Sequence, residues 1–529
     1  MKNKKWLLAL VLTLVMAILA ACGGDDSADD SSDAGDSDTS DKPQVLVFGR
    51  GGDSVSLDAA AVTDGESIKV TQNIYETLLN FNEKDTTVEA GLAKEWEVSE
   101  DGLTYTFKLQ EGVKFHDGTE LNAEAVKANF ERWSAGAKDE FYYYNSMFRA
   151  EDQDLITSIE TPDANTVVIT LSRPQAPFLK NIAMAVFGIA SPAAFDGLGE
   201  NPVGTGPFKF KEWKRNDSIT LVKNEEYWQE GLPKLDTLII RSIPDNSARL
   251  NELIAGNIDL ADGINPSDAK TISGDSSLQL IERPSMNVGY LGLTVTRKPF
   301  DDVKVRQAVN YAIDKQAIVD AFFEGYADVA KNPMPPSVSG YNDDIEGYTF
   351  DPEKAKALLA ESSYNGEELE LWAMPVPRPY MPDGQKVAEA IQKNLEDVGI
   401  KTKIVSFEWA TYLDKASKGE ADMFLLGWTG DNGDADNFLY ALLDEDNIGS
   451  NNYTYYKNDE VHKLFIQAQT EVDEEKRNEL YKQAQVLIHE DAPWVNLAHS
   501  TPLLAAKANV EGFVPHPTGS ESLHNVFIK

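Results

Sequence analysis

At roughly 150 residues per domain, a chain of 529 residues has room for several domains or for two large lobes. Acidic residues outnumber Lys and Arg by 87 to 48, which gives a formal charge of −39 and excludes a basic surface for nucleic acid or anionic lipid. The chain has one cysteine, which excludes an internal disulfide and a metal site built from several cysteines.

The N-terminus has the pattern of a secretory signal. Lysines among the first five residues precede an apolar stretch at 6–21, which is too short for a comfortable transmembrane span. Residues 19–23 resemble a bacterial lipobox, which implies that residues 1–21 are removed and that the Cys22 thiol carries a diacylglyceryl group. Several acyl chains anchor a protein stably, so we expect the mature protein on the extracytoplasmic face of the bacterial cell membrane.

Residues 22–42 form the next segment, which is rich in Asp and Ser and almost free of apolar residues. Such a segment cannot bury enough surface to offset its ordering entropy, so we predict that it is disordered. Its repelling negative charges favour an extended tether between the anchor and the folded body.

The remainder alternates between two hydrophobic periodicities. A period of two predicts strands at 44–49, 104–109, 166–171 and 237–243. A helical period predicts helices at 123–133, 247–254, 303–318, 352–359, 384–398 and 474–489. Strands and helices are interleaved without a strict βαβ order, which indicates an α/β protein with mixed sheets.

Motifs of enzymatic chemistry are missing from the sequence. It contains no G-x-x-x-x-G-K-[ST] loop, no H-E-x-x-H and no G-x-S-x-G. No two of its six histidines have the helical spacing of metal ligands. We therefore expect no catalytic residues, no cofactor and no metal site, and a binding protein rather than an enzyme.

Two segments have unusual compositions. Residues 426–438 are polar and glycine-rich and follow a short apolar run, as ligand-binding loops of α/β proteins often do. They do not fit the calcium loop of an EF-hand. Residues 371–382 contain four prolines around Arg378, and the fixed φ of the prolines restricts an arginine suited to recognising a carboxylate. The alternatives are surface Asx turns and a rigid surface loop.

These two segments closely resemble the loops of the family of solute-binding proteins that serve bacterial ABC importers of oligopeptides, dipeptides and nickel, and in particular its dipeptide-binding subgroup. The resemblance extends along nearly the whole folded body. It includes the segments 95–107, 112–118, 204–208, 287–291, 301–308 and 498–501.

The resemblance implies a two-lobed periplasmic-binding-protein fold of the large peptide-binding type, with mixed sheets and a hinge between the lobes. Lobe I would comprise residues 43–283 and 500–529, and lobe II residues 284–499. The ligand would lie between the lobes, which would close on it by bending at the hinge.

Carried over by position, the resemblance also implies that Arg378 holds the ligand α-carboxylate and Asp431 its α-ammonium. The two charges of an extended dipeptide are at most about 7 Å apart, so a fixed arginine and a fixed aspartate together measure ligand length. Further candidates for the pocket walls are Tyr380, Trp409, Trp428, Thr429, Gly430, Asn287 and Gly52. Ala435 and the turn at 51–54 depart from the pattern of the subgroup, so contacts from lobe I are less firmly assigned.

The leading hypothesis is a lipid-anchored, monomeric receptor that passes dipeptides to an ABC permease with its ATPase subunits. Alternatives on the same fold are a receptor for longer oligopeptides, for haem or for a nickel chelate, with His116 and His499 as the candidates for direct nickel contact. A hydrolase would need a nucleophile–base pair or a metal triad that the sequence does not contain. A sensor or adhesin without transport is a further alternative.

Overall fold

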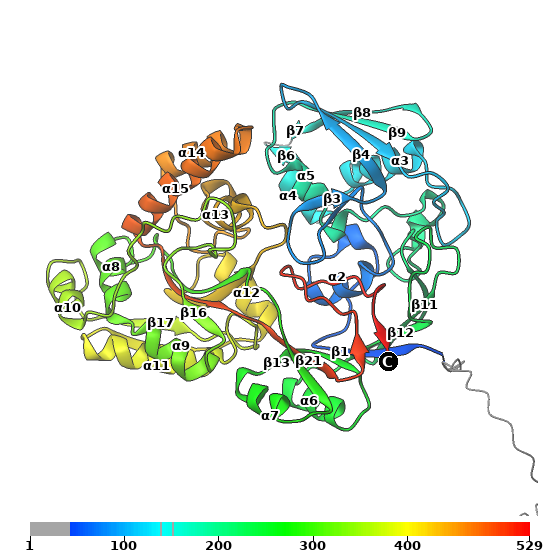
Figure 1. Cartoon of the computed structure of the whole chain (residues 1–529). Coiled ribbons are helices and arrows are strands. Elements are labelled where there is room, and N and C mark those ends of the chain that lie inside the picture. Colours follow the sequence, from blue (N-terminus) through cyan, green and yellow to red (C-terminus); the bar gives the residue numbers. More distant parts are fainter. Residues whose placement is uncertain (1–42, 138–139, 151–152) are drawn as a thin grey trace, which may run out of the picture. The chain divides into compact units, whose positions relative to one another are not determined.

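The computed structural model describes residues 43–137, 140–150 and 153–529. The predicted signal peptide, the predicted lipid-attachment residue Cys22 and the predicted acidic tether lie outside the described residues. From Pro43 to Lys529 the chain forms one compact unit. Two large mixed sheets, one on each side of the view, dominate that unit (Figure 1).

The first large sheet has seven strands in the order β10-β11-β12-β1-β13-β21-β14. Strand β1 is parallel to β12 and β13, and the other neighbours are antiparallel. The strands are β1 (Val45–Arg50), β10 (Phe208–Lys214), β11 (Ser218–Lys223), β12 (Thr237–Ser242), β13 (Leu260–Ile264), β14 (Leu278–Glu282) and β21 (Leu503–Lys507). Strand β21 therefore returns from the far end of the chain into a sheet built by its first half.

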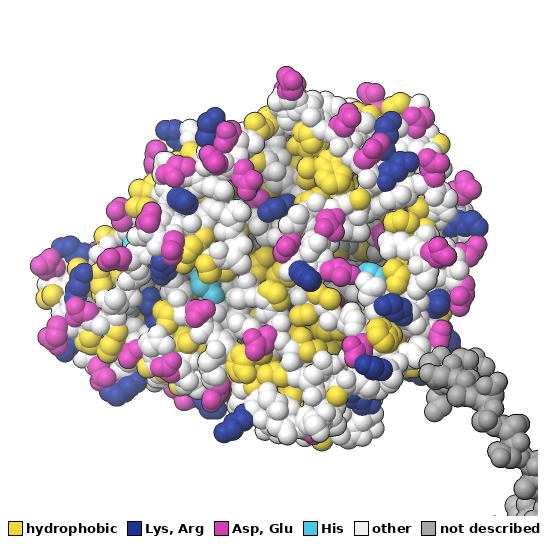
Figure 2. Space-filling model, in the orientation of Figure 1, with side chains coloured by type: hydrophobic (Ala, Val, Ile, Leu, Met, Phe, Trp, Pro, Cys, Tyr) yellow, Lys and Arg dark blue, Asp and Glu magenta, His cyan; other side chains and the backbone are white. Residues whose placement is uncertain are grey.

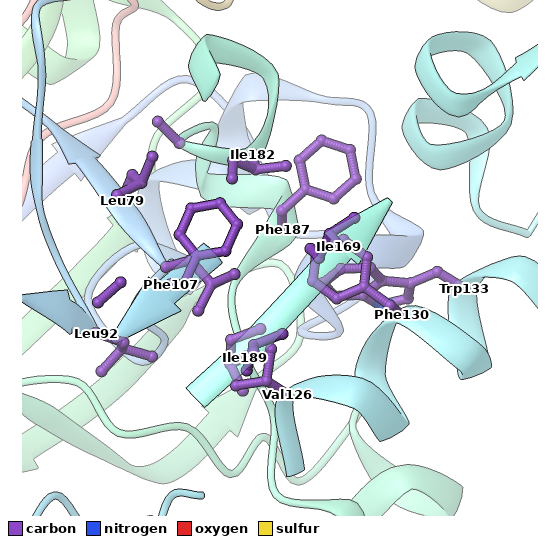
Figure 3. Packing of buried hydrophobic residues seen from close by; sticks show 14 of the residues in the cluster. Leu79, Leu92, Phe107, Val126, Phe130, Trp133, Ile169, Ile182, Phe187 and Ile189 are labelled. Carbon is purple, nitrogen blue, oxygen red and sulfur yellow. The ribbon is translucent and has the colours of Figure 1, made fainter. Parts of the chain in front are cut away.

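A four-stranded antiparallel sheet, β4-β5-β9-β8, packs with nearby helices around a separate core. In β5 every second side chain is buried, namely Tyr105, Phe107 and Leu109, as its period of two predicts. Figure 3 shows Phe107 close to the aromatic and aliphatic side chains of the helices and of β9. The strands and helices are β4 (Ala93–Val98), β5 (Thr104–Leu109), β8 (Ile156–Asp163), β9 (Thr166–Leu171), α3 (Ala123–Ala135), α4 (Tyr142–Phe148) and α5 (Phe178–Ile182).

Smaller elements complete this half of the unit. Helix α2 follows β1, and α6 and α7 cover one face of the seven-stranded sheet with a core of their own. The helices are α2 (Gly65–Thr71), α6 (Asn246–Ile254) and α7 (Ala269–Ser273). Short strand pairs are β2 (Leu79–Phe81) with β3 (Val88–Ala90), β6 (Arg149–Ala150) with β7 (Gln153–Asp154), and β22 (Val510–Glu511) with β23 (Phe527–Ile528).

The second large sheet has six strands in the order β16-β20-β15-β19-β17-β18. Its central strand β15 is buried along its whole length. Leu291 and Leu293 face one hydrophobic core, while Val288 and Tyr290 face another, because successive side chains of a strand point to opposite sides. The strands are β15 (Asn287–Leu293), β16 (Ala327–Val329), β17 (Glu368–Trp372), β18 (Lys401–Val405), β19 (Met423–Thr429) and β20 (Trp494–Ser500).

Helices cover both faces of this six-stranded sheet (Figure 1). One core contains side chains of α8 (Val303–Ala312), α9 (Lys315–Phe323) and α11 (Gly384–Asp397), with α10 (Pro352–Ala360) against α8. The opposite core contains side chains of α12 (Trp409–Ser417), α13 (Ala435–Leu443), α14 (Asp459–Thr470) and α15 (Glu474–Asp491). The fold is thus a two-lobed α/β fold with mixed sheets, as the sequence predicted.

Two connections link the large sheets. The chain leaves the first sheet at Glu282 and enters the second at Asn287, and it returns between Ser500 and Leu503. The buried amide of Asn287 ties the connections together: its Nδ2 donates to the Ser500 carbonyl at 2.8 Å, and its Oδ1 accepts from the Ser500 N–H and hydroxyl at 3.0 Å each. The lobe boundaries at 283/284 and 499/500 stay a prediction.

Two local predictions were wrong. The helix predicted at 303–318 is divided into α8 and α9, because Ile313 is extended and the Asp314 carboxylate caps a new helix by accepting from the Ala317 N–H at 3.0 Å. The polar loop predicted at 426–438 is much shorter, because β19 continues to Thr429 and α13 begins at Ala435. The other predicted helices and strands are present with small shifts at their ends.

The visible surface of the folded body carries charged side chains of both signs (Figure 2). Figure 2 shows acidic and basic side chains interspersed over one face of the molecule. Within 43–137, 140–150 and 153–529, no helix combines the length and the apolar character needed to cross a membrane.

Candidate functional site

The candidate site begins where two neighbouring strands of the six-stranded sheet end. Strands β17 and β19 are parallel, with Leu371 opposite Met423. The proline-rich loop that carries Arg378 follows β17, and the loop that carries Asp431 follows β19. Because the carboxyl ends of parallel strands meet at one edge of a sheet, both loops emerge at that edge, where α/β proteins bind ligands.

Asp431 is held in a fixed position by its own loop. Its N–H donates to Asn437 Oδ1 at 2.9 Å, and Asn437 Nδ2 donates to Asp431 Oδ2 at 3.0 Å. Trp428 Nε1 donates to the same Asn437 oxygen at 3.1 Å. One asparagine on α13 therefore aligns the end of β19, the loop backbone and the carboxylate.

The Asp431 carboxylate has no cationic partner among the described residues. Burial raises its pKa to about 6, while hydrogen bonds from Asn437 and Tyr143 lower the pKa. The Tyr143 hydroxyl, from α4, lies 3.4 Å from Oδ1. A partly buried carboxylate without a counter-ion favours a cationic ligand, because a bound cation would stabilise its charged form.

The other acids of this loop have structural roles. Asp434 caps α13 by accepting from the Asp436 N–H at 3.0 Å, and Arg477 binds both of its oxygens at 2.6 and 2.8 Å. This arginine holds the pKa of Asp434 down to about 2. Asp436 accepts from Tyr481 at 3.1 Å. Of these three acids, Asp434 alone has a cationic partner among the described residues, whereas Asp431 and Asp436 accept hydrogen bonds only from neutral groups.

Arg378 lies exposed at the tip of the proline-rich loop. Its backbone exchanges hydrogen bonds with Met381 at 3.1 and 2.9 Å, which closes a tight turn. The guanidinium stands 5.6 Å from the ring centroid of Trp409, and its Nη1 donates to the Pro377 carbonyl at 3.4 Å. No carboxylate among the described residues lies within ion-pair distance of Arg378, so the N–H edge of the guanidinium, which binds carboxylates, is available.

Tyr380 anchors the proline-rich loop on the sheet. It is only 9% exposed, and burial raises its pKa while the neighbouring Arg378 opposes that shift. A Cβ on Gly427 of β19 would lie 2.2 Å from the Tyr380 ring, so this close contact requires glycine. Tyr380 thus sets the height of the loop above β19.

The remaining predicted pocket residues lie in different surroundings. Trp409 begins α12 and stacks on Tyr412 with ring centroids 5.8 Å apart. Thr429 ends β19 opposite Asn287 of β15. The Asn287 side chain is buried, and its amide binds Ser500, as described above.

Two predicted glycines lie on different segments. The Gly430 N–H donates to the Met286 carbonyl at 2.8 Å and extends the pairing beyond β19. Gly52 lies in the loop after β1, where its carbonyl accepts from the Ser242 hydroxyl at 3.1 Å. The roles of all these residues in ligand binding stay predictions.

The sequence reasoning missed the side chains that reach the Asp431 loop from the first half of the chain. Lys180 Nζ donates to the Gly433 carbonyl at 3.0 Å, and Asn432 Nδ2 donates to Asn181 Oδ1 at 2.8 Å. Thr86, in the β2–β3 hairpin, is packed directly against Gly433. Two of these contacts join residues more than 250 positions apart. No local sequence pattern predicts such contacts.

A cavity of about 280 Å³ lies beside Asp431. Apart from Asp431, its lining comes from the first half of the chain and from the C-terminal segment after β21. Its volume is close to the lower end of the roughly 300–1,000 Å³ range of small-molecule sites. Arg378 and Trp409 are not part of the lining, so the cavity extends from the Asp431 end of the candidate site.

The two histidines considered for nickel are each hydrogen-bonded to a backbone carbonyl. His116 Nε2 contacts the Gly206 carbonyl at 2.9 Å, and His499 Nδ1 contacts the Asn287 carbonyl at 2.8 Å. Burial lowers the pKa of each to about 4. Neither belongs to a group of three convergent ligand atoms within the described part of the chain.

Comparisons with known proteins give consistent results. The family model for bacterial extracellular solute-binding proteins, family 5 Middle, matches residues 87–450. Heme-binding protein A of Haemophilus influenzae is 38% identical, and the alignment covers 98% of each chain. The dipeptide-binding protein of Escherichia coli K12 is 39% identical over 92% of this chain and 95% of its own. An ABC transporter-associated periplasmic binding protein from Helicobacter pylori, solved with the peptide STSA, is 35% identical, with a TM-score of 0.82 over 92% of this chain and 98% of its own.

Proposed function

Because the chain belongs to the bacterial extracellular solute-binding proteins of family 5, we propose that it captures free dipeptides outside the cell membrane and delivers them to the permease of an ABC importer. It binds its ligand and releases it unchanged. The relative from Escherichia coli that is named as a dipeptide-binding protein supports this ligand class.

One observation carries the proposal. The parallel strands β17 and β19 end in two loops. Among the described residues, the arginine in one loop has no carboxylate partner and the aspartate in the other has no cationic partner. Arg378 binds the ligand α-carboxylate through its fork of N–H donors. Asp431 accepts from the ligand α-ammonium. A zwitterionic peptide binds both charged groups at once. A peptide with an acylated N-terminus or a blocked carboxylate binds only one of them.

Closure of the lobes completes the site. Lys180, Asn181 and Tyr143 contact the Asp431 loop from the other side. These contacts are few and polar, so they suit an interface that opens and re-forms as ligand enters and leaves.

The proposal is tested by calorimetric titration of residues 43–529 with Ala-Ala. Arg378→Ala and Asp431→Asn each remove a charge-assisted hydrogen bond, typically 1.5–3 kcal/mol, so each should weaken binding by roughly 10- to 150-fold. Arg215→Ala is the matched control, since its pairing with Glu200 is exposed at the surface. Unchanged affinity in both site variants would contradict the proposal.

A lipid anchor at Cys22 is part of the same proposal. The lipobox-like ending of the signal supports it, as does the need of a receptor to remain near its permease. Cells labelled with palmitate should incorporate label into the wild-type protein and not into Cys22→Ser, which should appear in the medium. Equal labelling of both proteins would contradict the anchor.

We further propose that the receptor acts as a monomer, which sedimentation at micromolar concentration tests.

A second candidate ligand class is a longer peptide. The relative from Helicobacter pylori was solved with a four-residue peptide, and a ligand of that length would extend past one of the two charged groups. The two classes differ in whether both ends of the ligand are held, and the final experiment of the Discussion separates them.

A further inference from the structure

The cavity beside Asp431 has a one-sided charge. Acidic side chains in its lining are Glu76, Glu83, Glu89, Asp431 and Glu521, and none of the described residues that line it is Lys or Arg. Two histidines, His516 and His524, also contribute to the lining, and burial lowers the pKa of both, so they add no positive charge at neutral pH.

Each acid contributes differently to the field in the cavity. Glu521 is neutralised by Arg283, whose Nη2 lies 2.6 Å from its Oε1. Glu83 and Glu89 are exposed at the rim and accept hydrogen bonds from neutral amides at 2.6 and 2.7 Å. Their carboxyl groups extend the acidic lining from the inside of the cavity to its exposed edge.

Glu76 lies in the lining of the cavity, and among the described residues only neutral donors contact its carboxyl group. Its Oε1 accepts from Tyr227 at 2.8 Å and from Trp228 at 3.1 Å, and its Oε2 accepts from Thr205 at 2.7 Å and from Trp228 at 3.0 Å. Burial raises the pKa of Glu76 to about 7. A cationic side chain in the cavity would stabilise the charged form of this group and would bring the first positive charge to it.

Apolar side chains also contribute to the lining of the cavity. Tyr75, Phe81, Met184 and Val186 line the cavity together with the acids. A long aliphatic side chain with a cationic end matches this arrangement, since such a chain packs its methylene groups on apolar walls and presents its charge at the tip. An acidic side chain would place like charges together, and a short one would leave the cavity unfilled.

We propose that this cavity receives the lysine or arginine side chain of the first residue of the ligand, so that the receptor prefers dipeptides with a basic N-terminal residue. The inference rests on the proposed function, because Asp431 fixes the ligand ammonium at the mouth of the cavity. Arg378 is not in the lining, so the second residue of the ligand extends away from it.

Titration of residues 43–529 with Lys-Ala, Ala-Lys, Ala-Ala and Glu-Ala tests the inference. Lys-Ala should bind at least tenfold more tightly than Glu-Ala and more tightly than Ala-Lys. Equal affinity for Lys-Ala, Ala-Lys and Glu-Ala would overturn the inference and leave the proposed function intact. Failure of all four dipeptides to bind would overturn both.

Variants locate the preference in the cavity. Glu76→Gln should reduce the ratio of the Glu-Ala and Lys-Ala dissociation constants severalfold, and Glu89→Gln, at the exposed rim, should reduce it less. Glu89→Gln changes an exposed side chain, so it keeps the test valid if Glu76→Gln does not fold. Glu200→Gln, an exposed acid outside the cavity, is the control. An unchanged ratio in folded Glu89→Gln and Glu76→Gln would overturn the assignment.

Discussion

The contact between Gly433 and Thr86 gives a direct test of lobe closure. Gly433 has φ +64°, and a Cβ at this position would lie 1.9 Å from Thr86 Oγ1 and 2.7 Å from Thr86 Cβ. The two residues belong to segments on opposite sides of the candidate site. Gly433→Ala therefore cannot keep this contact, and the lobes must close less completely or distort their loops.

The expected magnitude follows from separating two costs. The positive φ costs an alanine about 1–2 kcal/mol, but it does so in the open and the closed protein alike and so does not enter the dissociation constant. The steric overlap exists only in the closed protein, and overpacking of this kind costs about 1–3 kcal/mol. Gly433→Ala should thus weaken Ala-Ala binding by roughly 5- to 150-fold.

Matched variants separate the overlap from other effects. Gly112→Ala has a similar φ of +75° with nothing within 4 Å of the added Cβ, so its affinity should equal that of the wild type. Thr86→Gly in combination with Gly433→Ala removes the colliding atoms and should restore most of the affinity. Calorimetry measures all four proteins. Wild-type affinity in folded Gly433→Ala would refute the closed contact as part of the bound state.

Two further predictions concern pH and stability. Because burial raises the pKa of Asp431 to about 6, dipeptide affinity should fall as the pH drops below 6, by up to about tenfold per pH unit. Asp431→Asn should abolish this dependence. In the ligand-free protein the same raised pKa increases the free energy of unfolding as the pH falls from about 6 towards 4. Arg283→Met leaves the buried Glu521 without its cation and should cost about 3–5 kcal/mol in urea unfolding, whereas Arg241→Met, in a half-exposed pair, should cost at most about 1 kcal/mol. Affinity that is flat between pH 5 and 7, or equal losses in the two arginine variants, would contradict these expectations.

The sequence predicted the elements that depend on local patterns. Strands were predicted at 104–109 and 166–171 and found at those residues, and buried and partly buried side chains alternate along β5 and along β9 from Val167. The break at Asp314 was missed because an aspartate on the polar face of a helix and an aspartate that caps a new helix look alike in a periodic pattern. Only the extended conformation of Ile313 separates the two cases.

The candidate site was predictable only in part. The composition of two loops pointed to Arg378 and to the polar segment 426–438, and the family resemblance selected Asp431 within that segment. The same segment contains Asp434, which looks equivalent in sequence. The roles of the two acids differ because Arg477, more than 40 positions away, binds Asp434 and leaves Asp431 unpaired. Likewise Tyr143 reaches the site through a contact between residues 288 positions apart, which only the fold creates.

The central claim is that both charged ends of a free dipeptide are held at once. Isothermal titration of residues 43–529 with Ala-Ala, N-acetyl-Ala-Ala and tetra-alanine tests it most directly. We predict that Ala-Ala binds, and that the acetylated dipeptide and the tetrapeptide bind at least tenfold more weakly, because the first has lost its ammonium and the second is too long for both groups. Equal affinity for the tetrapeptide would contradict the claim and make the protein a receptor for peptides of variable length.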